Sequence, residues 1–194
     1  MSKTVDALVK KAQGGDMDAF EELIRQHQQK VFNIAYRMSG NYDDASDMAQ
    51  EALIKVYLNF DKFDGKSQFS TWLYRVTTNS CLDQIKKKKK NVTVSLDSEL
   101  ETDEGTVGRE IESTDRTPQE ELENKELSAE INKALKQLSE RHRTIIILRD
   151  INGMSYEDVA KTLNCSVGTV KSQVNRARAA LKKIMLKNPE LFFE

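Results

Sequence analysis

Apolar residues recur along most of the chain at steps of three and four, the spacing that places them on one side of an α-helix. Over residues 1–90 this pattern predicts four helices. A short one runs through residues 5–9 and stops at Gly14-Gly15, and the second runs from residue 16 or 18 to Gly40. The third spans residues 42–60, and the fourth starts after Phe69, with Ser70 as its N-cap, and ends in a run of lysines.

The last third of the chain predicts four shorter helices. The first follows Thr117 and Pro118, a cap and a proline at the first helical position, and its apolar face is formed by Leu127, Ile131, Ala134, Leu135 and Leu138. The second spans residues 141–152 and ends at Gly153, and it is apolar on nearly all sides at residues 145–148. Ser155 caps the third helix, and Ser166 caps the last one, over residues 167–187. The predicted fold is all-α.

Composition narrows the class of protein further. Two prolines and eight glycines in 194 residues are too few for the many turns of an all-β fold. No apolar run approaches the roughly 20 residues of a membrane-spanning helix, and the N-terminus lacks the apolar core of a signal peptide, so we expect a cytoplasmic protein without membrane insertion. Two cysteines and two histidines, far apart in sequence, give no metal-ligand spacing. Because a Gly-rich phosphate loop and a nucleophile elbow are also missing, we expect no metal, no cofactor and no enzymatic activity.

The overall charge of −1 conceals three segments. Residues 1–90 carry a net charge of +3, residues 91–124 carry −9, and residues 125–194 carry +5. The acidic segment has no aromatic residue, and a segment of low hydrophobicity and high charge does not repay the entropy of folding. We therefore expect two small helical domains, residues 1–90 and 118–194, joined by a flexible acidic linker at residues 91–117. The linker is either a simple tether or a mimic of nucleic acid toward its basic neighbours.

The two last predicted helices have the spacing of a helix-turn-helix, with Asn164 in the tight turn between them. The second of them would lie in the major groove of DNA, since one side is basic and polar. Lysine and arginine suit guanine or phosphate, asparagine suits adenine, and hydroxyls suit either. The candidate DNA-contacting residues are Thr169, Lys171, Ser172, Asn175 and Arg176, with Arg178 at the edge. The alternative is an ordinary helical hairpin with a solvated basic face.

A second candidate surface lies on the helix that follows Phe69. Arg75, Asn79 and Lys86 fall together on one face, with Trp72 at its edge, and such a stripe can neutralise phosphates and stack on unpaired bases. The alternative is that Trp72 belongs to the core. The lysine run at residues 86–90 has two interpretations as well, a solvated end that complements the helix dipole or a site for phosphates.

The helix over residues 42–60 carries a third candidate surface, opposite its apolar face. This acidic ridge consists of Asp44, Asp47, Gln50, Glu51 and Ile54, at steps of three and four. Its members either form a solvated helix surface or dock on another protein, since an exposed isoleucine among acids is typical of a docking ridge.

Two groups of motifs resemble bacterial sigma factors. The stretches YDDASDMAQEA (residues 42–52) and FSTWLYRV (69–76) resemble sigma region 2, and YEDVA (156–160) together with VGTVKS (167–172) and RAR (176–178) resemble region 4. Both blocks, in this order and with no other sigma region, are typical of the extracytoplasmic-function (ECF) type. The resemblance covers residues 5–90 and 118–187.

The resemblance implies a role for each surface. The acidic ridge would dock on the clamp coiled coil of core RNA polymerase, and apolar surface of region 4 would sit on the polymerase flap. The loop at residues 61–68, which includes Phe63, and the helix with Trp72, Arg75, Asn79 and Lys86 would capture and melt the −10 element of promoter DNA, and the last helix would read the −35 element. An anti-sigma factor is a further expected partner. The competing hypothesis is a conventional helix-turn-helix regulator that acts without the polymerase, but it leaves the stripe around Trp72 without a role.

Overall fold

The computed structural model describes residues 3–94 and 118–187, and every regular element within those ranges is helical, which confirms the predicted all-α fold. The chain divides into two compact units, residues 1–104 and residues 105–194. Each unit has a core of its own. The predicted linker at residues 91–117 lies outside the described part, except that residues 91–94 continue the last helix of unit 1.

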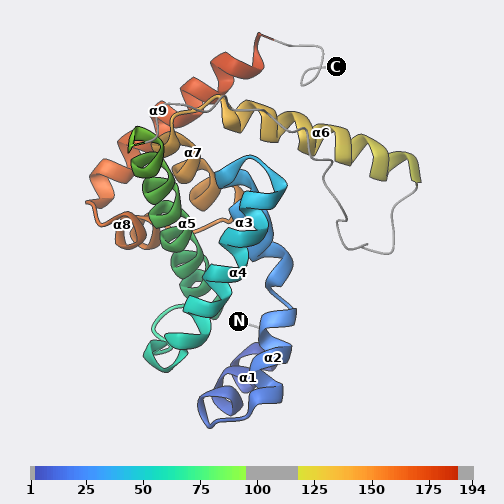
Figure 1. The fold of residues 1–194 in the computed structure, drawn as a ribbon, viewed down its shortest axis with the longest axis vertical. Helices are drawn as coiled ribbons and strands as arrows, with labels where there is room; N and C mark the ends of the chain where they lie inside the picture. The colour runs from blue at the N-terminus through green and yellow to red at the C-terminus, as the bar shows by residue number, and fades with distance from the viewer. Residues whose placement is uncertain (1–2, 95–117, 188–194) are drawn as a thin grey trace. The chain divides into compact units, whose positions relative to one another are not determined.

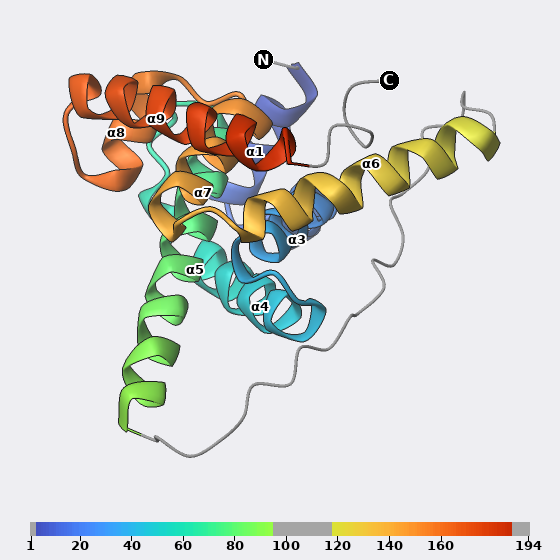
Figure 2. The same ribbon diagram turned by 90° about the horizontal axis from the view of Figure 1, so that it is seen from above.

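Unit 1 consists of α1 (Lys3–Gln13), α2 (Met17–Arg25), α3 (Gln28–Ser39), α4 (Tyr42–Leu58), the 3-10 turn η1 (Phe60–Lys62) and α5 (Phe69–Val94). Helices α3, α4 and α5 pack against one another, and α1 packs on α2 (Figures 1 and 2). The largest side chains of the core are fully buried and come from four helices: Leu23, Ile34, Met48 and Leu73. Small residues of α4, Ala45 and Ala52, are also fully buried, so neighbouring helices approach α4 closely.

Local capping sets the α3–α4 corner. Gly40 ends α3 with a φ of +89°, a left-handed conformation that favours glycine. Asn41 then caps α4, because its side-chain oxygen accepts a hydrogen bond of 2.8 Å from the backbone N–H of Asp44. The predicted end of one helix at Gly40 and the start of the next at residue 42 are therefore confirmed.

The predicted single helix over residues 16–40 is wrong, because the structure breaks it into α2 and α3 at His27. The Nδ1 of His27 donates to the carbonyl of Leu23 at 2.8 Å, and that carbonyl would accept a backbone N–H in an unbroken helix. The backbone N–H of His27 bonds instead to Ile24, at 2.9 Å. The imidazole also meets the ring of Phe69 edge to face, 5.3 Å between centroids, so the break is fixed by tertiary packing.

The predicted start of the fourth helix is displaced by one residue. Helix α5 begins at Phe69, and the carbonyl of Gln68 accepts the N–H of Trp72 at 3.1 Å. Ser70 therefore lies in the first turn and is not the N-cap.

Unit 2 consists of α6 (Pro118–Lys136), α7 (Glu140–Ile146), a π-helical turn η2 (Ile147–Ile151), α8 (Tyr156–Leu163) and α9 (Val167–Met185). Helix α9 is central to this unit and packs on α6, α7 and α8. One cluster of its core contains Leu135, Leu138, Ile146 and Ala177. The predicted burial of residues 145–148 is confirmed.

The first predicted helix of unit 2 differs at its N-terminal part. Helix α6 extends away from the other helices of its unit there (Figures 1 and 2), and Ile131, further along the helix, packs against the core cluster. Leu127 is consequently 44% exposed, although the helical spacing placed it on the core face. Leu138 is buried as predicted but lies beyond the end of α6. Thr117, the predicted cap, lies outside the described residues.

The predicted helix over residues 141–152 contains a π turn that the sequence did not indicate. The N–H of Asn152 bonds to the carbonyl of Ile147, five residues back, at 3.0 Å. Such a turn holds one residue more than an α-helical turn and therefore changes the direction of the side chains that follow. Gly153 ends the segment with a φ of +67°. Over residues 3–94 and 118–187, no helix is long and apolar enough to cross a bilayer.

Candidate nucleic-acid and protein interfaces

The junction between α8 and α9 has the geometry of a helix-turn-helix. Ser155 caps α8 by accepting the N–H of Asp158 at 3.0 Å, and Ser166 caps α9 by accepting the N–H of Thr169 at 3.1 Å. Between the two helices Asn164 adopts the left-handed conformation, with a φ of +49° and a ψ of +54°. Both caps and the turn residue are as the sequence predicted, and α8 packs directly on α9.

Helix α9 separates its buried and exposed faces cleanly. Val170, Val174 and Ala177 are fully buried. The exposed residues of the other face include Lys171, Ser172, Asn175 and Arg176. This face can therefore present a lysine, an arginine and an amide to the floor of a DNA groove.

Two hydroxyls of the predicted contact set already make contacts within the N-terminal part of α9 and its cap. Thr169 is half-buried, and its hydroxyl lies 2.8 Å from that of Ser166. Ser172 is exposed, but its hydroxyl donates to the carbonyl of Thr169 at 2.9 Å. Each hydroxyl oxygen keeps a lone pair for an incoming donor.

Arg178 is engaged within its own unit. Its Nε lies 2.9 Å from one carboxylate oxygen of Asp150, and its Nη2 lies 2.5 Å from the other. This two-pronged ion pair joins α9 to the π turn η2, and the adjacent carboxylate raises the pKa of the guanidinium. Arg178 is thus a poorer candidate for a base contact than Lys171 or Arg176.

The π turn and the start of α8 also bring cations over an aromatic ring. The guanidinium carbon of Arg149 lies 4.6 Å from the ring centroid of Tyr156, and the ammonium of Lys171 lies 5.9 Å from it. Sequence reasoning placed none of Arg149, Asp150 and Tyr156 at a site. Arg149 and Asp150 stand out in the sequence only as a pair of charges in an otherwise apolar helix, and Tyr156 only as part of the YEDVA motif; nothing in the spacing shows what they contact.

On α5 the structure divides the predicted −10 residues into two groups. Asn79 and Lys86 are exposed, and Arg75 is half-buried. Trp72 and Phe63, in contrast, are only 5% and 4% exposed. The prediction of Trp72 as an open stacking plane is therefore wrong for this conformation, and the alternative that it belongs to the core is confirmed.

The burial of these aromatics follows from the loop between α4 and α5. Residues of η1 and the loop fold back on α5, so that Phe60, Phe63, Phe69 and Trp72 form a cluster in which ring centroids are 5.4 to 6.3 Å apart. A hydrogen bond of 2.7 Å from the Gln13 side chain to the carbonyl of Phe63 also fixes the loop. Tyr74 is buried too, and its burial raises the pKa of the phenol.

The acidic ridge of α4 is exposed at Asp47, Gln50 and Ile54, and Ile54 is 51% exposed. The other two members have partners within the unit. Glu51 is half-buried and pairs with Lys55 at 2.9 Å. The centre of the ridge therefore offers to a partner an acid that is unpaired among the described residues, an amide and an apolar side chain.

Asp44 is held from two directions. It accepts from the side chain of Asn41 at 2.9 Å and from Lys88 on α5. Partial burial alone would raise the pKa of Asp44, but the hydrogen bonds from Lys88 and Asn41 outweigh it and lower the pKa. The lysine run at residues 86–90 is exposed, and α5 continues past it to Val94, so the run does not form the helix end.

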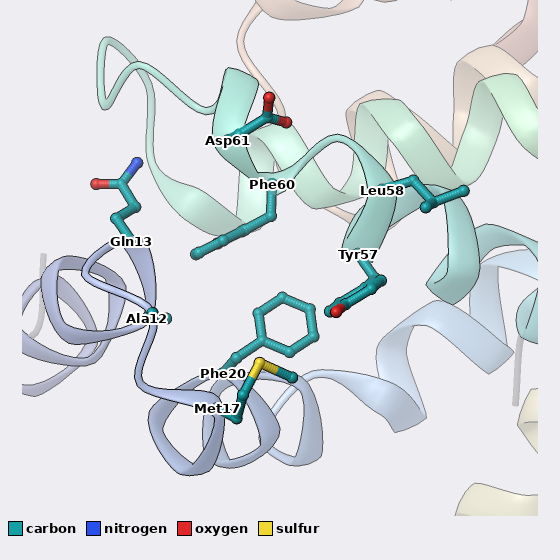
Figure 3. A pocket seen from close by; sticks show the side chains of 9 residues that line it. Ala12, Gln13, Met17, Phe20, Tyr57, Leu58, Phe60 and Asp61 are labelled. Atoms are coloured by element: carbon teal, nitrogen blue, oxygen red, sulfur yellow. The ribbon is translucent and has the colours of Figure 1, made fainter.

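A shallow apolar cleft of about 530 Å³ lies beside the C-terminal end of α4. Met17 and Phe20 of α2 face Tyr57 and Phe60 across it (Figure 3). Phe20 meets the rings of Tyr57 and Phe60 edge to face, at 5.5 and 5.0 Å between centroids. Met17, Tyr57 and Leu58 are all more than half exposed, which is unusual for a cluster of large apolar side chains.

No group of three or more metal-ligating side chains occurs over the part of the chain that the structure describes. Cys81 is buried in α5, and burial raises the pKa of its thiol to about 12. A thiol in this state is neutral and behaves as a small apolar side chain.

Comparisons with known proteins identify the family of each helical unit. Residues 23–91 match the family model of sigma-70 region 2, and residues 128–181 match that of sigma-70 region 4. The chain is 38% identical to the ECF RNA polymerase sigma factor SigW of Bacillus subtilis over 184 residues, which cover 94% of this chain and 97% of the relative. It is 35% identical to the RNA polymerase sigma-H factor of Pseudomonas aeruginosa over 178 residues, 92% of each chain.

A solved structure has the same fold. The sigma factor RpoE of Bartonella quintana, in complex with the anti-sigma factor NepR, aligns with a TM-score of 0.68 at 27% identity, over 87% of this chain and 98% of that one.

Proposed function

The chain belongs to the sigma-70 family as an ECF sigma factor, and we propose how its two helical domains divide the work of promoter-specific transcription initiation. It is an alternative sigma factor, a specificity subunit of RNA polymerase and not an enzyme. We assign core binding and the −10 element to residues 1–90, and the −35 element to residues 118–194. The linker at residues 91–117 keeps the two domains on one chain, so that each raises the effective concentration of the other once the polymerase fixes both.

The −35 element is read by α9. The observation that carries this assignment is a capped helix-turn-helix whose second helix buries Val170, Val174 and Ala177 and exposes a basic and polar face. Lys171 and Arg176 reach guanine or phosphate, and Asn175 reaches adenine. Thr169 and Ser172 accept hydrogen bonds at the start of the helix. Arg178 stabilises α9 through its ion pair with Asp150, and any contact that it makes with DNA is with the backbone, from the edge of the exposed face of α9.

The −10 element is captured by α5 and the loop before it. Arg75, Asn79 and Lys86 contact the DNA strand, and the lysine run neutralises nearby phosphates. Phe63 and Trp72 hold the loop against α5 in the free protein. Either ring stacks on an unpaired base only after η1 and the loop move away from α5.

Core RNA polymerase docks on the acidic ridge. Asp47, Gln50 and Ile54 make the direct contact with the clamp coiled coil, because they are exposed and the unit leaves them available. Glu51 and Asp44 join the contact by exchanging Lys55 and Lys88 for basic groups of the polymerase. Apolar surface of unit 2 contacts the polymerase flap.

An anti-sigma factor is the further partner that we infer. The sigma factor RpoE of Bartonella quintana was solved in complex with one. In this chain the exposed apolar side chains of unit 1, among them Met17, Tyr57 and Leu58, provide area that such a protein would bury. The proposed location is the cytoplasm and, when the protein is bound to the polymerase, the nucleoid. An anti-sigma factor in the membrane would hold the free protein there.

The test is reconstitution of transcription from purified components. Promoter fragments are first selected from genomic DNA by the complex of the chain with core polymerase. These fragments should direct initiation only when the chain and core polymerase are both present. The chain alone should bind these duplexes weakly. A conventional helix-turn-helix regulator would instead bind duplex DNA by itself, with the steep salt dependence of phosphate contacts, and core polymerase would not change its affinity.

A further inference from the structure

The ring of Tyr156 is a meeting point of three elements of unit 2. Tyr156 is the first residue of α8, Arg149 comes from the π turn η2, and Lys171 comes from the exposed face of α9. The guanidinium carbon and the ammonium lie over the ring at 4.6 and 5.9 Å from its centroid, both within the roughly 6 Å at which a cation is attracted to an aromatic face. The phenol ring is half-buried, so water screens this attraction only in part.

The guanidinium over the ring is itself fixed. Arg149 Nη1 donates to the carbonyl of Met154 at 2.7 Å, and the N–H of Met154 bonds to the carbonyl of Leu148 at 3.1 Å. Met154 is buried, so this anchor is part of the core. Arg149 therefore holds the tyrosine ring from a rigid base, and the ring can in turn hold a flexible side chain.

The π turn supplies a second tie from the adjacent residue. Asp150 holds the guanidinium of Arg178 on α9 through two hydrogen bonds. Two consecutive residues of the π turn thus contact different helices of the helix-turn-helix: Arg149 contacts α8 through Tyr156, and Asp150 contacts α9 through Arg178. The extra residue of the π turn sets the direction of this pair relative to α7.

We propose that Tyr156 is a positioning residue for promoter recognition: its ring, which Arg149 also contacts, directs the ammonium of Lys171 toward the DNA. A lysine on a helix surface has four rotatable bonds and loses much conformational freedom when it is fixed. The ring restricts that freedom before DNA arrives, so less is lost on binding. This inference rests on the proposed contact of Lys171 with the −35 element.

The experiment is a double-mutant cycle between Tyr156 and Lys171, measured in the complex with core polymerase. The affinity for a promoter fragment selected by the holoenzyme is determined for the wild type, Tyr156→Leu, Lys171→Ala and the double variant. Leucine keeps apolar bulk and removes the ring, and Tyr156→Phe is the matched control because it keeps the ring. Tyr156→Leu should weaken binding about two- to fivefold in the wild-type background, the range of one partly exposed cation–π contact. In the Lys171→Ala background it should have no effect, and Tyr156→Phe should match the wild type.

Two further measurements separate positioning from a structural effect. Tyr156→Leu should leave the slope of log affinity against log salt unchanged, since no phosphate contact is lost. Pentafluorophenylalanine at position 156 keeps the approximate size of the ring and reverses its charge distribution. It should therefore weaken promoter binding about two- to fivefold, the range of the cation–π contact, without the change of packing that leucine introduces.

The outcomes distinguish two failures. If Lys171→Ala binds the promoter as well as the wild type, the proposed contact of Lys171 is wrong. If Lys171→Ala weakens binding but Tyr156→Leu costs the same factor in both backgrounds, the contact stands and the positioning role of Tyr156 is overturned.

Discussion

Reversing the charge of Asp47 should disable polymerase binding without disturbing the fold. Asp47 lies in the middle of the acidic ridge on α4 and is exposed. Its carboxylate makes no hydrogen bond or ion pair with any other described residue, unlike Asp44 and Glu51 on the same ridge. A substitution at such a surface position changes the free energy of unfolding by no more than about 0.5 kcal/mol.

The effect on binding is much larger, because Asp47→Lys turns an attraction into a repulsion. One pair of unit charges at 4 Å is worth about 4 kcal/mol at an effective dielectric constant of about 20. Salt at 0.15 M screens beyond about 8 Å, and the new side chain can turn away from the interface, so the full value is not reached. Loss of a close interfacial charge costs about 2 to 5 kcal/mol in measured complexes. We expect about 2 to 3 kcal/mol, or a Kd for core polymerase roughly 30- to 150-fold higher.

The assay is a titration of fluorescently labelled protein with core polymerase at 0.15 M salt, followed by anisotropy. Asp83→Lys is the matched control, since Asp83 is also exposed, belongs to the same unit on α5 and changes the net charge equally. Thermal unfolding followed by circular dichroism should give the same midpoint for both variants and the wild type. A Kd for Asp47→Lys within threefold of the control value, in a folded protein, would refute the docking ridge.

Three other perturbations test separate parts of the structure. Lys171→Ala should lower promoter-directed initiation about tenfold and leave core binding unchanged. The control is Lys183→Ala, which removes the same charge from α9 about 18 Å further along the helix and should have little effect. Equal losses in the two variants would mean that only the total charge of the helix matters. Thr77→Val should stabilise unit 1 by about 1 kcal/mol in urea unfolding, because the buried Thr77 hydroxyl has no hydrogen-bond partner among the described residues. Thr144→Val should destabilise unit 2, because the Thr144 hydroxyl donates to a carbonyl at 2.8 Å, and a change of the same sign in both variants would contradict this explanation. At pH 8 a thiol reagent should modify Cys81 only after unfolding, because burial raises the pKa of the Cys81 thiol to about 12 and hides the sulfur from the reagent. Rapid modification in the native protein would show that α5 opens.

Helix ends were predictable from the sequence because capping is local chemistry. Gly40, Ser155 and Ser166 each end or start a helix where the sequence indicated. Asn164 adopts the left-handed turn that its side chain tolerates. The exposed and buried faces of α9 followed from helical spacing alone, and Lys171, Ser172, Asn175 and Arg176 are exposed as predicted.

The features that were missed depend on residues far apart in the chain. The break at His27 needs the ring of Phe69, 42 positions later, and helical spacing cannot show that a side chain will take a backbone carbonyl. Trp72 fell at the boundary between two faces, and only the loop with Phe63 decides that it is buried. Asp150 and Arg178 are 28 positions apart, so their ion pair was equally invisible.

The most direct test of the whole account is a sizing-column experiment with the full chain and bacterial core RNA polymerase at moderate salt, followed by probing of the bound promoter for unpaired bases. We expect a stable complex that elutes as one species and opens promoter DNA at the −10 element, while neither component opens it alone. Failure to form the complex, together with tight binding of duplex DNA by the chain alone, would contradict the assignment of both interfaces.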